Sequence, residues 1–437
     1  MKTARQTAFE ILLKIEKNRA YSNIALDSAV RGASPDSTDC AFISRLVYGV
    51  TERKITLDYI FSEYLRQPAA KLKPELLTVL RMGTYQLCFA DRIPASAAVN
   101  ESVVLAKNNG ASFASGLVNA VLRKVSQNGF RIYNELDETE RLSVEYSFPP
   151  ELVRFFIHHY GREGAVGIFK ASLLPKRTAA RVNTLKTDAA SLVELLGSEG
   201  VAACRADIEN ALYLELNGAV YELQSFRDGL FHVEDISSQL CVKALGAQPG
   251  ERVLDVCSAP GGKSFTAAQY MNNLGSIVSC DLYPQRVSLI KSGAGRLGIE
   301  IINADVNDAA VFNPALGDFD RVLCDVPCSG LGIITKKPEI KYKSLDDIKQ
   351  LIPIQKQILD TSCRYVKPGG SLVYSTCSLN PNENRRVCDA FLKEHPEFHS
   401  VSVLPELPRL VDEGDYITLT PHINNCDGFF IAAFVRE

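Results

Sequence analysis

The chain has 437 residues, of which 46% are hydrophobic and 23% are charged. This length predicts two or three domains. The N-terminus lacks the apolar core of a signal peptide, and no run approaches the roughly 18 apolar residues of a membrane span, so we expect a cytoplasmic protein without membrane contact. The twelve Cys include no CxxC pair, which predicts reduced thiols, and with only six His we expect no metal site.

Basic residues are concentrated near the N-terminus, although the net charge is only −3. Residues 1–130 contain 17 Lys and Arg against 11 Asp and Glu, which leaves 31 against 40 for the rest of the chain. A basic domain of this kind is suited to docking on nucleic acid. Charge alone fits an ordinary solvated surface equally well.

Apolar residues in segment 1–130 recur at helical spacing. Ala8, Ile11 and Leu12 fit one buried helix face, and Pro74 stands where a first helical turn would begin. Two later stretches, "ASAAVNESVVLAK" and "ASFASGLVNAVLRKV", repeat the pattern. The segment is therefore predicted to be an all-α bundle.

Segment 131–235 has a mixed pattern. Its strand-like stretches "RTAARVNTL" and "ALYLEL" flank "TDAASLVELLGSEG", a helix with a polar start and a Gly stop. "SFPPELVRFF", which precedes them, resembles a hinge leading into a helix. We expect linker helices followed by a small α+β subdomain with an RRM-like layout.

Strands and helices alternate in segment 236–437. The expected strands are "RVLDVC", "SIVSCDL", "IEIINAD", "RVLCDVP", "SLVYSTC" and "FFIAAFV". Nearly continuous apolar strands separated by helices predict a Rossmann-like α/β domain whose parallel sheet is covered on both faces. In such sheets, ligands bind beyond the carboxyl ends of the strands.

The stretch "VLDVCSAPGGKSF" runs from a strand through a Gly-rich turn into a helix. A phosphate-binding P-loop would need Gly where Cys257 stands, which argues against ATP. Asp281, at the end of the next strand, is placed to accept from both ribose hydroxyls of a nucleoside, and Asp305 to meet an adenine. This pattern favours S-adenosylmethionine, although either Asp taken singly is also a candidate helix cap.

Two cysteines, Cys328 and Cys377, follow strand ends in "DVPC" and "STC", and Asp325 lies beside the first. A single Cys is more often a small buried hydrophobe than a catalyst. Methylation of cytosine at C5 nevertheless needs a thiolate to add to C6, a group on the base edge and a second group near C5. These residues supply all three, with Asp325 as the base contact, but the sequence alone leaves open which thiol attacks.

The motifs "LDVCSAPGGKS", "DVPCSGLG" and "LVYSTCSLNPNEN" resemble those of the RNA cytosine-C5 methyltransferases of the Sun/Fmu type. The first 130 residues resemble the NusB-like RNA-binding domain that precedes the bacterial enzymes. The resemblance implies that Cys377 is the nucleophile and that Cys328 assists release. It also implies a set of residues that bind S-adenosylmethionine: Cys257, Ser258, Ala259, Pro260, Gly261, Gly262, Lys263, Asp281, Asp305 and Asp325.

The same resemblance implies a substrate and partner, namely 16S ribosomal RNA, at the 967-type position, or an early small-subunit assembly intermediate. We expect a monomer. One alternative is a DNA-cytosine or exocyclic-amine methyltransferase, and another is an RNA-binding antitermination or assembly factor with an inactive methyltransferase fold. The amine alternative is weakened because such enzymes typically carry an Asp-Pro-Pro-Tyr type loop.

The chain departs from the family pattern at two places. Lys336 and Lys337 stand where Arg-Arg is usual, and Arg385 stands where an acidic residue is common. Because Lys binds phosphate as a point charge and Arg as a fork, RNA contacts are expected to be rearranged. Arg181 and Asn183 in "RVNTL" match a family motif and are either RNA-facing or domain-bracing.

Overall fold

The computed structural model describes residues 2–18, 22, 25–27, 29, 37–132, 135–175, 177–216 and 218–437. Two compact units make up the chain. Unit 1 comprises Met1–Leu173 and Ile334–Lys343, and unit 2 comprises Leu174–Ile333 and Ser344–Glu437. The division at Leu173 falls inside the predicted segment 131–235, whose boundaries stay a prediction.

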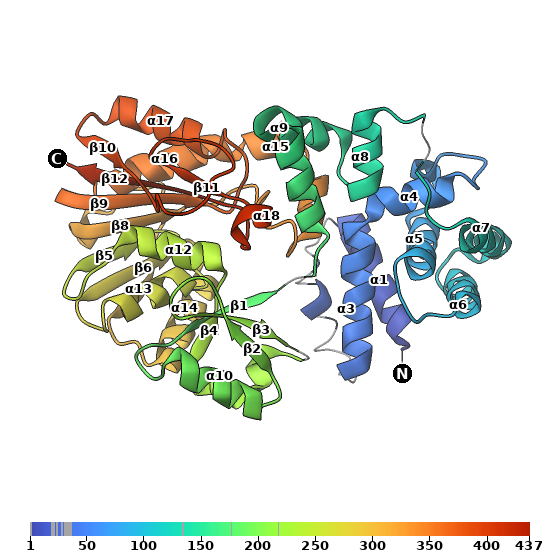
Figure 1. Cartoon of the computed structure of the whole chain (residues 1–437), viewed down its shortest axis with the longest axis horizontal. Coiled ribbons are helices and arrows are strands. Elements are labelled where there is room, and N and C mark those ends of the chain that lie inside the picture. Colours follow the sequence, from blue (N-terminus) through green and yellow to red (C-terminus); the bar gives the residue numbers. More distant parts are fainter. Residues whose placement is uncertain are drawn as a thin grey trace. The chain divides into compact units, whose positions relative to one another are not determined.

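Unit 1 is helical (Figure 1), and the prediction of an all-α bundle for segment 1–130 is confirmed. Its helices are α1 (Ala4–Asn18), α3 (Ser37–Glu52), α4 (Lys54–Ser62), α5 (Pro74–Cys88), α6 (Ala95–Asn108), α7 (Ser115–Asn128), α8 (Glu138–Tyr146) and α9 (Pro150–Ser172). Helix α5 begins with Pro74 in its first turn, where the missing N–H has no helical partner to lose. Helix α8 begins with a capping box between Asp137 and Glu140.

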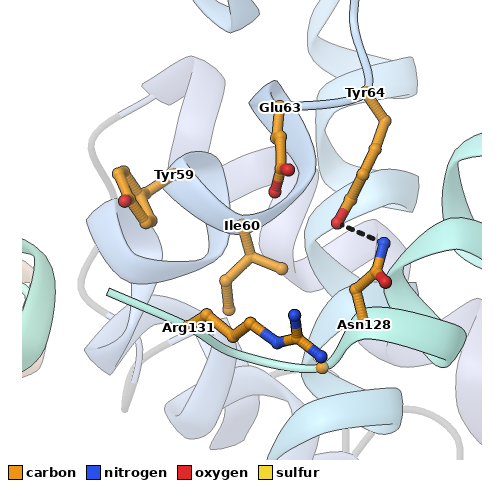
Figure 2. A pocket seen from close by; sticks show the side chains of 7 residues that line it. Tyr59, Ile60, Glu63, Tyr64, Asn128 and Arg131 are labelled. Carbon is orange, nitrogen blue, oxygen red and sulfur yellow. Dashed lines mark hydrogen bonds between the residues drawn. The ribbon is translucent and has the colours of Figure 1, made fainter. Parts of the chain in front are cut away.

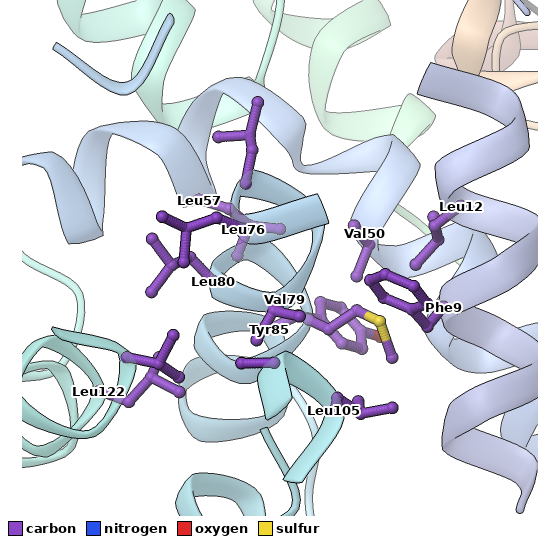
Figure 3. Packing of buried hydrophobic residues seen from close by; sticks show 14 of the residues in the cluster. Phe9, Leu12, Val50, Leu57, Leu76, Val79, Leu80, Tyr85, Leu105 and Leu122 are labelled. Atoms are coloured by element: carbon purple, nitrogen blue, oxygen red, sulfur yellow. The ribbon is translucent and has the colours of Figure 1, made fainter. Parts of the chain in front are cut away.

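Helix α5 is the centre of the unit 1 core. Its residues from Leu76 to Gln86 are all buried, and it packs against α1, α3, α4, α6 and α7. Figure 3 shows Leu76, Val79, Leu80 and Tyr85 of this helix among apolar side chains of its neighbours. In this core, α1, α3, α4, α6 and α7 therefore pack around the buried helix α5.

The segment 334–343, which follows the Pro-Cys motif in the chain, packs in unit 1. Lys341 is buried and donates from Nζ to the carbonyl of Glu52 at 2.7 Å, and Tyr342 donates to the carbonyl of Thr51 at 2.9 Å. Burial lowers the pKa of Lys341 to about 7, against the opposing effect of nearby Glu52. Lys336 and Lys337 lie in the same segment and are half-buried.

Unit 2 begins with a small antiparallel sheet of order β2-β3-β1-β4. Its elements are β1 (Thr178–Val182), α10 (Ala189–Ser198), β2 (Ala202–Arg205), β3 (Ala211–Glu215), α11 (Gln224–Arg227) and β4 (Phe231–Val233). The predicted strands correspond to β1 and β3, and the predicted helix to α10. Leu192 and Leu196 of α10 pack on this sheet, so the expected α+β arrangement is present.

The large sheet of unit 2 has the order β10-β12-β9-β8-β5-β6-β7, with β11 paired to β12. Its strands are β5 (Arg252–Asp255), β6 (Ser276–Asp281), β7 (Ile302–Val306), β8 (Phe319–Asp325), β9 (Val366–Thr376), β10 (Phe398–Val401), β11 (Ile417–Leu419) and β12 (Phe429–Arg436). Its helices are α12 (Ile236–Leu245), α13 (Gly262–Tyr270), α14 (Pro284–Leu297), α15 (Leu345–Lys349), α16 (Leu351–Cys363), α17 (Arg385–Glu394) and α18 (Pro421–Asn424).

Helices cover both faces of this sheet, as predicted (Figure 1). Successive strand residues alternate between two cores: Leu323 packs with α12, α13 and α14, whereas Val322 and Cys324 pack with α16 and α17. The prediction of a uniformly parallel sheet is wrong at one edge, because β12 runs antiparallel to β9, β10 and β11. The short connection from β11 is enough to bring β12 beside β11 as an antiparallel partner, whereas a parallel partner would need a long crossover.

The strand order reverses between β5 and β8. Successive strands β5, β6 and β7 extend to one side, and β8 and β9 extend to the other, all parallel. The loops that leave β5 and β8 therefore diverge at the carboxyl edge, which is the usual ligand position in such sheets. Within the described part of the chain, no helix is long and apolar enough to cross a membrane.

Candidate active site

The Gly-rich turn follows β5 directly and leads into α13. Gly261 has φ of +111°, and a Cβ there would lie 2.4 Å from the ring of Phe265, so only Gly fits. The turn closes with hydrogen bonds from the Gly261 amide to the Ser258 carbonyl and from the Phe265 amide to the Gly261 carbonyl, each 2.8 Å. The predicted strand–turn–helix geometry is present.

A buried carboxyl lies behind this turn. Asp255 is 1% exposed and its Oδ2 accepts from Ser264 Oγ at 2.7 Å, while Oδ1 is buried without a hydrogen-bond partner among the residues that the structure describes. Burial raises the pKa of Asp255 to about 6. Ser264 also contacts the hydroxyls of Ser258 and Ser279, which fixes the turn against β6.

The two predicted nucleoside-binding carboxylates differ in their surroundings. Asp281 ends β6, is 3% exposed and pairs with Arg286 Nη1 at 3.2 Å. Arg286 also donates to the Ala259 carbonyl at 2.6 Å, so it joins the turn to Asp281. Asp305, on β7, is exposed and accepts from the amide of Val306. Both lie towards the carboxyl edge of the sheet, Asp281 on the strand next to β5 and Asp305 on the strand beyond it.

Asp325 ends β8 and has a donor on each oxygen. Lys263 Nζ donates to Oδ2 at 2.7 Å, and Ser375 Oγ donates to Oδ1 at 2.8 Å. Burial alone would lower the pKa of Lys263, but the Asp325 carboxylate raises it above the usual value. Lys263 is thus held as a cation that joins the Gly-rich turn to the Asp-Val-Pro-Cys motif.

The two predicted cysteines are brought together. The Sγ atoms of Cys328 and Cys377 lie 3.0 Å apart, although 49 residues separate them in the chain. This contact follows from the pairing of β8 with β9, in which Asp325 lies opposite Ser375. The loops that carry the thiols continue from those two positions, so both sulfurs come to the carboxyl edge.

The contact between the sulfurs affects their chemistry. The hydrogen bond with Cys377, together with burial, holds the pKa of the Cys328 thiol well above its usual range. Cys328 therefore keeps its proton at neutral pH while the two sulfurs are in contact. Burial also holds the pKa of Cys257, in the Gly-rich turn, well above the usual range.

Arg181 and Asn183 are buried and form hydrogen bonds within unit 2. Arg181 is 1% exposed and donates to Gln269 Oε1 and to the carbonyl of Glu209. Asn183 is fully buried and donates to the carbonyls of Gly229 and Leu297 at 2.8 Å each. Both side chains join the small sheet to α13 and α14, so they are domain-bracing.

Three residues of this site were missed by the sequence analysis: Asp255, Arg286 and Ser375. Ser375 stands two residues before Cys377, the spacing that puts strand side chains on one face, and this signal was available. Asp255 lies within the predicted strand "RVLDVC", and its apolar neighbours gave no signal of a role in the site. Arg286 follows Asp281 by five residues on the next helix, and no pattern distinguished it from a surface Arg.

The residues beyond β5, β6 and β7 fit a methyl donor that carries a nucleoside. Acidic side chains at the β6 and β7 ends suit ribose and adenine donors, and Asp255 Oδ1 is a buried acceptor without a partner in the described chain. The tight turn at Gly261 lets backbone approach a ligand closely. These residues match S-adenosylmethionine, and Cys257 stands in this turn where a phosphate-binding loop would need Gly.

A separate cavity of about 100 Å³ lies in unit 1 (Figure 2). Its lining consists of Tyr59, Ile60, Glu63, Tyr64, Asn128, Gly129 and Arg131. Asn128 Nδ2 donates to the Tyr64 hydroxyl at 2.9 Å, and Lys124 Nζ lies 5.8 Å from the centre of the Tyr64 ring. Aromatic rings beside Lys and Arg are a combination that RNA-binding surfaces use.

Comparison with known proteins extends over both units. The family model described as "16S rRNA methyltransferase RsmB/F" matches residues 242–435, and the model of the NusB family matches residues 2–127. The chain is 38% identical to the "Probable ribosomal RNA small subunit methyltransferase B" of Bacillus subtilis (strain 168), over 100% of this chain and 99% of that protein.

Two solved structures resemble the chain in fold. The protein PH0851 superposes with a TM-score of 0.84 and 24% identity over 100% of this chain and 99% of its own. A methyltransferase homologue from Pyrococcus horikoshii gives a TM-score of 0.61 and 28% identity over 69% of this chain and 100% of its own. The second structure matches a smaller share of the chain than the first.

Proposed function

The chain belongs to the ribosomal RNA small subunit methyltransferase B family, and from this premise we propose that it forms 5-methylcytosine in 16S ribosomal RNA, at the 967-type position. It is an RNA methyltransferase whose methyl donor is S-adenosyl-L-methionine. We further propose that it acts in the cytoplasm as a monomer, on the RNA or on an early small-subunit assembly intermediate. The observation that carries the C5 assignment is the contact between two thiols beside Asp325.

Two adjacent thiols support C5 chemistry over methylation of an exocyclic amine. An amine nitrogen is nucleophilic without covalent activation, whereas C5 becomes nucleophilic only after a thiolate adds to C6. Such a site also needs a base for the C5 proton. Cys328 and Cys377, 3.0 Å apart, supply one sulfur for each task.

Cys377 is proposed as the nucleophile. Cys328 keeps its proton while the sulfurs are in contact, because the hydrogen bond with Cys377 and burial raise its pKa. Once Cys377 has given up its own proton, its thiolate forms a bond to C6, and the electron pair of the C5–C6 double bond moves to C5. C5 then takes the methyl group that the sulfonium donor supplies.

Release is proposed to use Cys328. Once Cys377 is bonded to C6, its sulfur carries no charge, so the main cause of the raised pKa of Cys328 is removed. Cys328 can then ionise and take the proton from C5. The electron pair of that C–H bond restores the C5–C6 double bond and expels Cys377 as a thiolate.

Asp325 is proposed to hold the base edge. A carboxylate accepts from the exocyclic amine of cytosine, which is the donor that distinguishes this base on its edge. Lys263 and Ser375 each occupy one lone pair of the carboxylate and fix its plane. The proposed donor-binding residues are those of the Gly-rich turn, Cys257 to Lys263, with Asp281, Asp305 and Asp325. The base must leave any helix to reach this site.

Unit 1 is proposed to dock RNA. The NusB family match and the basic excess of residues 1–130 support this role. Some of its basic side chains form ion pairs within the unit, as Arg81 does with Asp58 and Glu16. We assign these side chains to the stability of the fold and not to RNA binding. The cavity beside Lys124 and Arg131 is the docking point we propose.

Bisulfite sequencing of 16S ribosomal RNA tests the proposal directly. We expect cells without this gene to lose one protected cytosine, and the purified protein to restore it with S-adenosyl-L-methionine. An unchanged pattern would exclude 5-methylcytosine formation in this RNA. Restoration by a protein that lacks both thiols would exclude the covalent route.

A further inference from the structure

Glu383 is a fully buried carboxylate that neither the donor site nor the base contact uses. Its Oε1 accepts from the amide of Ser329 at 2.7 Å, and its Oε2 accepts from Ser329 Oγ at 2.5 Å and from Ser378 Oγ at 2.7 Å. Ser329 directly follows Cys328, and Ser378 directly follows Cys377. One carboxylate therefore holds the residue next to each thiol.

A second side chain extends this support to the other side of Cys328. Gln355, on α16, donates from Nε2 both to the Pro327 carbonyl and to Glu383 Oε1, at 3.0 Å each. The residues before and after Cys328 are thus fixed through Gln355 and Glu383. The two serine hydroxyls also contact each other at 2.8 Å, which closes the network.

Cys377 has additional support that does not depend on Glu383. Asn384 accepts from Thr376 Oγ1 at 2.6 Å and donates to the Ser378 carbonyl at 2.8 Å, so it holds both residues beside Cys377. Loss of Glu383 would therefore disturb the position of Cys328 more than that of Cys377. The ladder between β8 and β9 ends near Asp325 and Ser375, before either thiol.

We propose that Glu383 is a positioning residue that sets the separation of the two thiols by holding Ser329 and Ser378 on one carboxylate. This inference rests on the proposed function, in which Cys377 attacks C6 and Cys328 takes the C5 proton. Attack needs only Cys377, whereas release needs both sulfurs at adjacent ring atoms. Loosening the support should therefore slow release more than attack.

The backbone offers a second link between the loops, which keeps variants testable. The Gly332 amide donates to the Cys377 carbonyl at 2.9 Å, independently of Glu383. A Cβ on Gly332 would lie 1.8 Å from the Gly428 carbonyl oxygen, so the close approach of these two loop segments requires Gly. We expect the loops to stay together, with altered thiol spacing, when the carboxylate is lost.

The test compares Glu383→Ala, Glu383→Gln and the double variant Ser329→Ala/Ser378→Ala in the full chain. Gln can accept from the Ser329 amide with its oxygen and donate to both hydroxyls, so it should rescue most of the activity lost in Glu383→Ala. The double variant removes the two hydroxyl groups that donate to Glu383, with little change in side-chain volume. It tests the same hydrogen bonds if Glu383→Ala does not fold. Glu413→Gln is the matched control, since Glu413 is 9% exposed and accepts from Thr418 Oγ1.

We expect Glu383→Ala and the double variant to lower kcat about 10- to 100-fold. The KM for RNA and the Kd for S-adenosyl-L-methionine should change less than about twofold. The fraction of protein in a covalent RNA adduct should rise above that of the unaltered chain. Glu413→Gln should match the unaltered chain in all of these quantities.

Two results would overturn the proposal. One is unchanged kcat and adduct fraction in both test variants. The other is a parallel loss of kcat, RNA affinity and donor affinity, which would mean a purely structural role. If the unaltered chain itself forms neither adduct nor 5-methylcytosine, the proposed function fails instead, so the two failures are distinguishable.

Discussion

The sulfur atoms of Cys328 and Cys377 lie 3.0 Å apart at the carboxyl ends of two neighbouring parallel strands. If C6 of a cytosine contacts one of these sulfurs, C5 of the same ring lies within reach of the other, because C5 and C6 are bonded to each other. The arrangement makes the two thiols distinguishable by experiment. Loss of either one should stop turnover, but with opposite effects on the covalent intermediate.

Replacing the proposed nucleophile should abolish both methylation and adduct. In Cys377→Ala no sulfur adds to C6, so we expect methyl transfer to fall by about 10³-fold or more. The measurement is incorporation of labelled methyl groups into RNA, together with a denaturing gel. Cys363→Ala, which truncates a buried Cys away from the site, is the control and should retain activity. Robust turnover of Cys377→Ala would remove that residue from the proposed role.

Replacing the release thiol should trap the adduct. In Cys328→Ala the attack on C6 proceeds, but the C5 proton has no base and Cys377 is not expelled. We expect a protein–RNA band of higher mass on a denaturing gel, at a yield well above that of the unaltered chain. Absence of this band, with S-adenosyl-L-methionine and RNA both present, would assign release to another base.

Substitutions of Lys263 and Asp325 should have non-additive effects on the free energy of unfolding. Each is partly shielded, with side-chain exposures of 13% and 24%, and removing one leaves the other without its charge partner. We expect Lys263→Met and Asp325→Asn each to cost about 1–3 kcal/mol of unfolding free energy, and the double variant to cost less than their sum. Urea unfolding measures all three. The exposed pair Lys349 and Asp346 is the control and should show no measurable coupling.

Asp255 should make stability depend on pH between about 4 and 6. Burial raises its pKa from 3.8 to about 6, so the folded state prefers the protonated acid, and this contribution is lost as the pH rises through 6. This rise in pKa corresponds to about 3 kcal/mol of unfolding free energy, lost between low pH and pH values above 6. We expect the stability of Asp255→Asn relative to the unaltered chain to increase from pH 4 to pH 6 and to level off above it. A difference independent of pH, in melting temperatures across this range, would contradict the raised pKa.

Lys124 and Arg131 should contribute to RNA binding. We expect Lys124→Ala/Arg131→Ala to weaken RNA binding and to lower the slope of log affinity against log salt by about 2, because two phosphate contacts are lost. Donor affinity should stay unchanged. Filter binding at several salt concentrations provides the slope, and Lys393→Ala, an exposed cation of unit 2, is the control. An unaltered slope would place the docking surface elsewhere.

Much of the fold was predictable because it follows local patterns. Helical spacing placed α1, α5, α6 and α7, and apolar runs placed the strands β5, β6, β8 and β9 within a few residues. The direction of β12 was not predictable in this way. A strand that is apolar along its length has the same sequence pattern in a parallel and in an antiparallel pair. Its neighbour and its direction depend on the packing of the whole sheet.

The sequence by itself determined which chemistry is available: the strand–turn–helix at Gly261, the acids after successive strands, and two cysteines with the motifs that surround them. Only the tertiary structure decided that Lys263 pairs with Asp325, that Arg181 and Asn183 brace the fold, and that Glu383 joins both thiol loops. The physical reason is that hydrogen bonds and ion pairs act over about 3 Å. Which residues meet at that distance across tens of positions depends on strand order and register, and local pattern does not specify either.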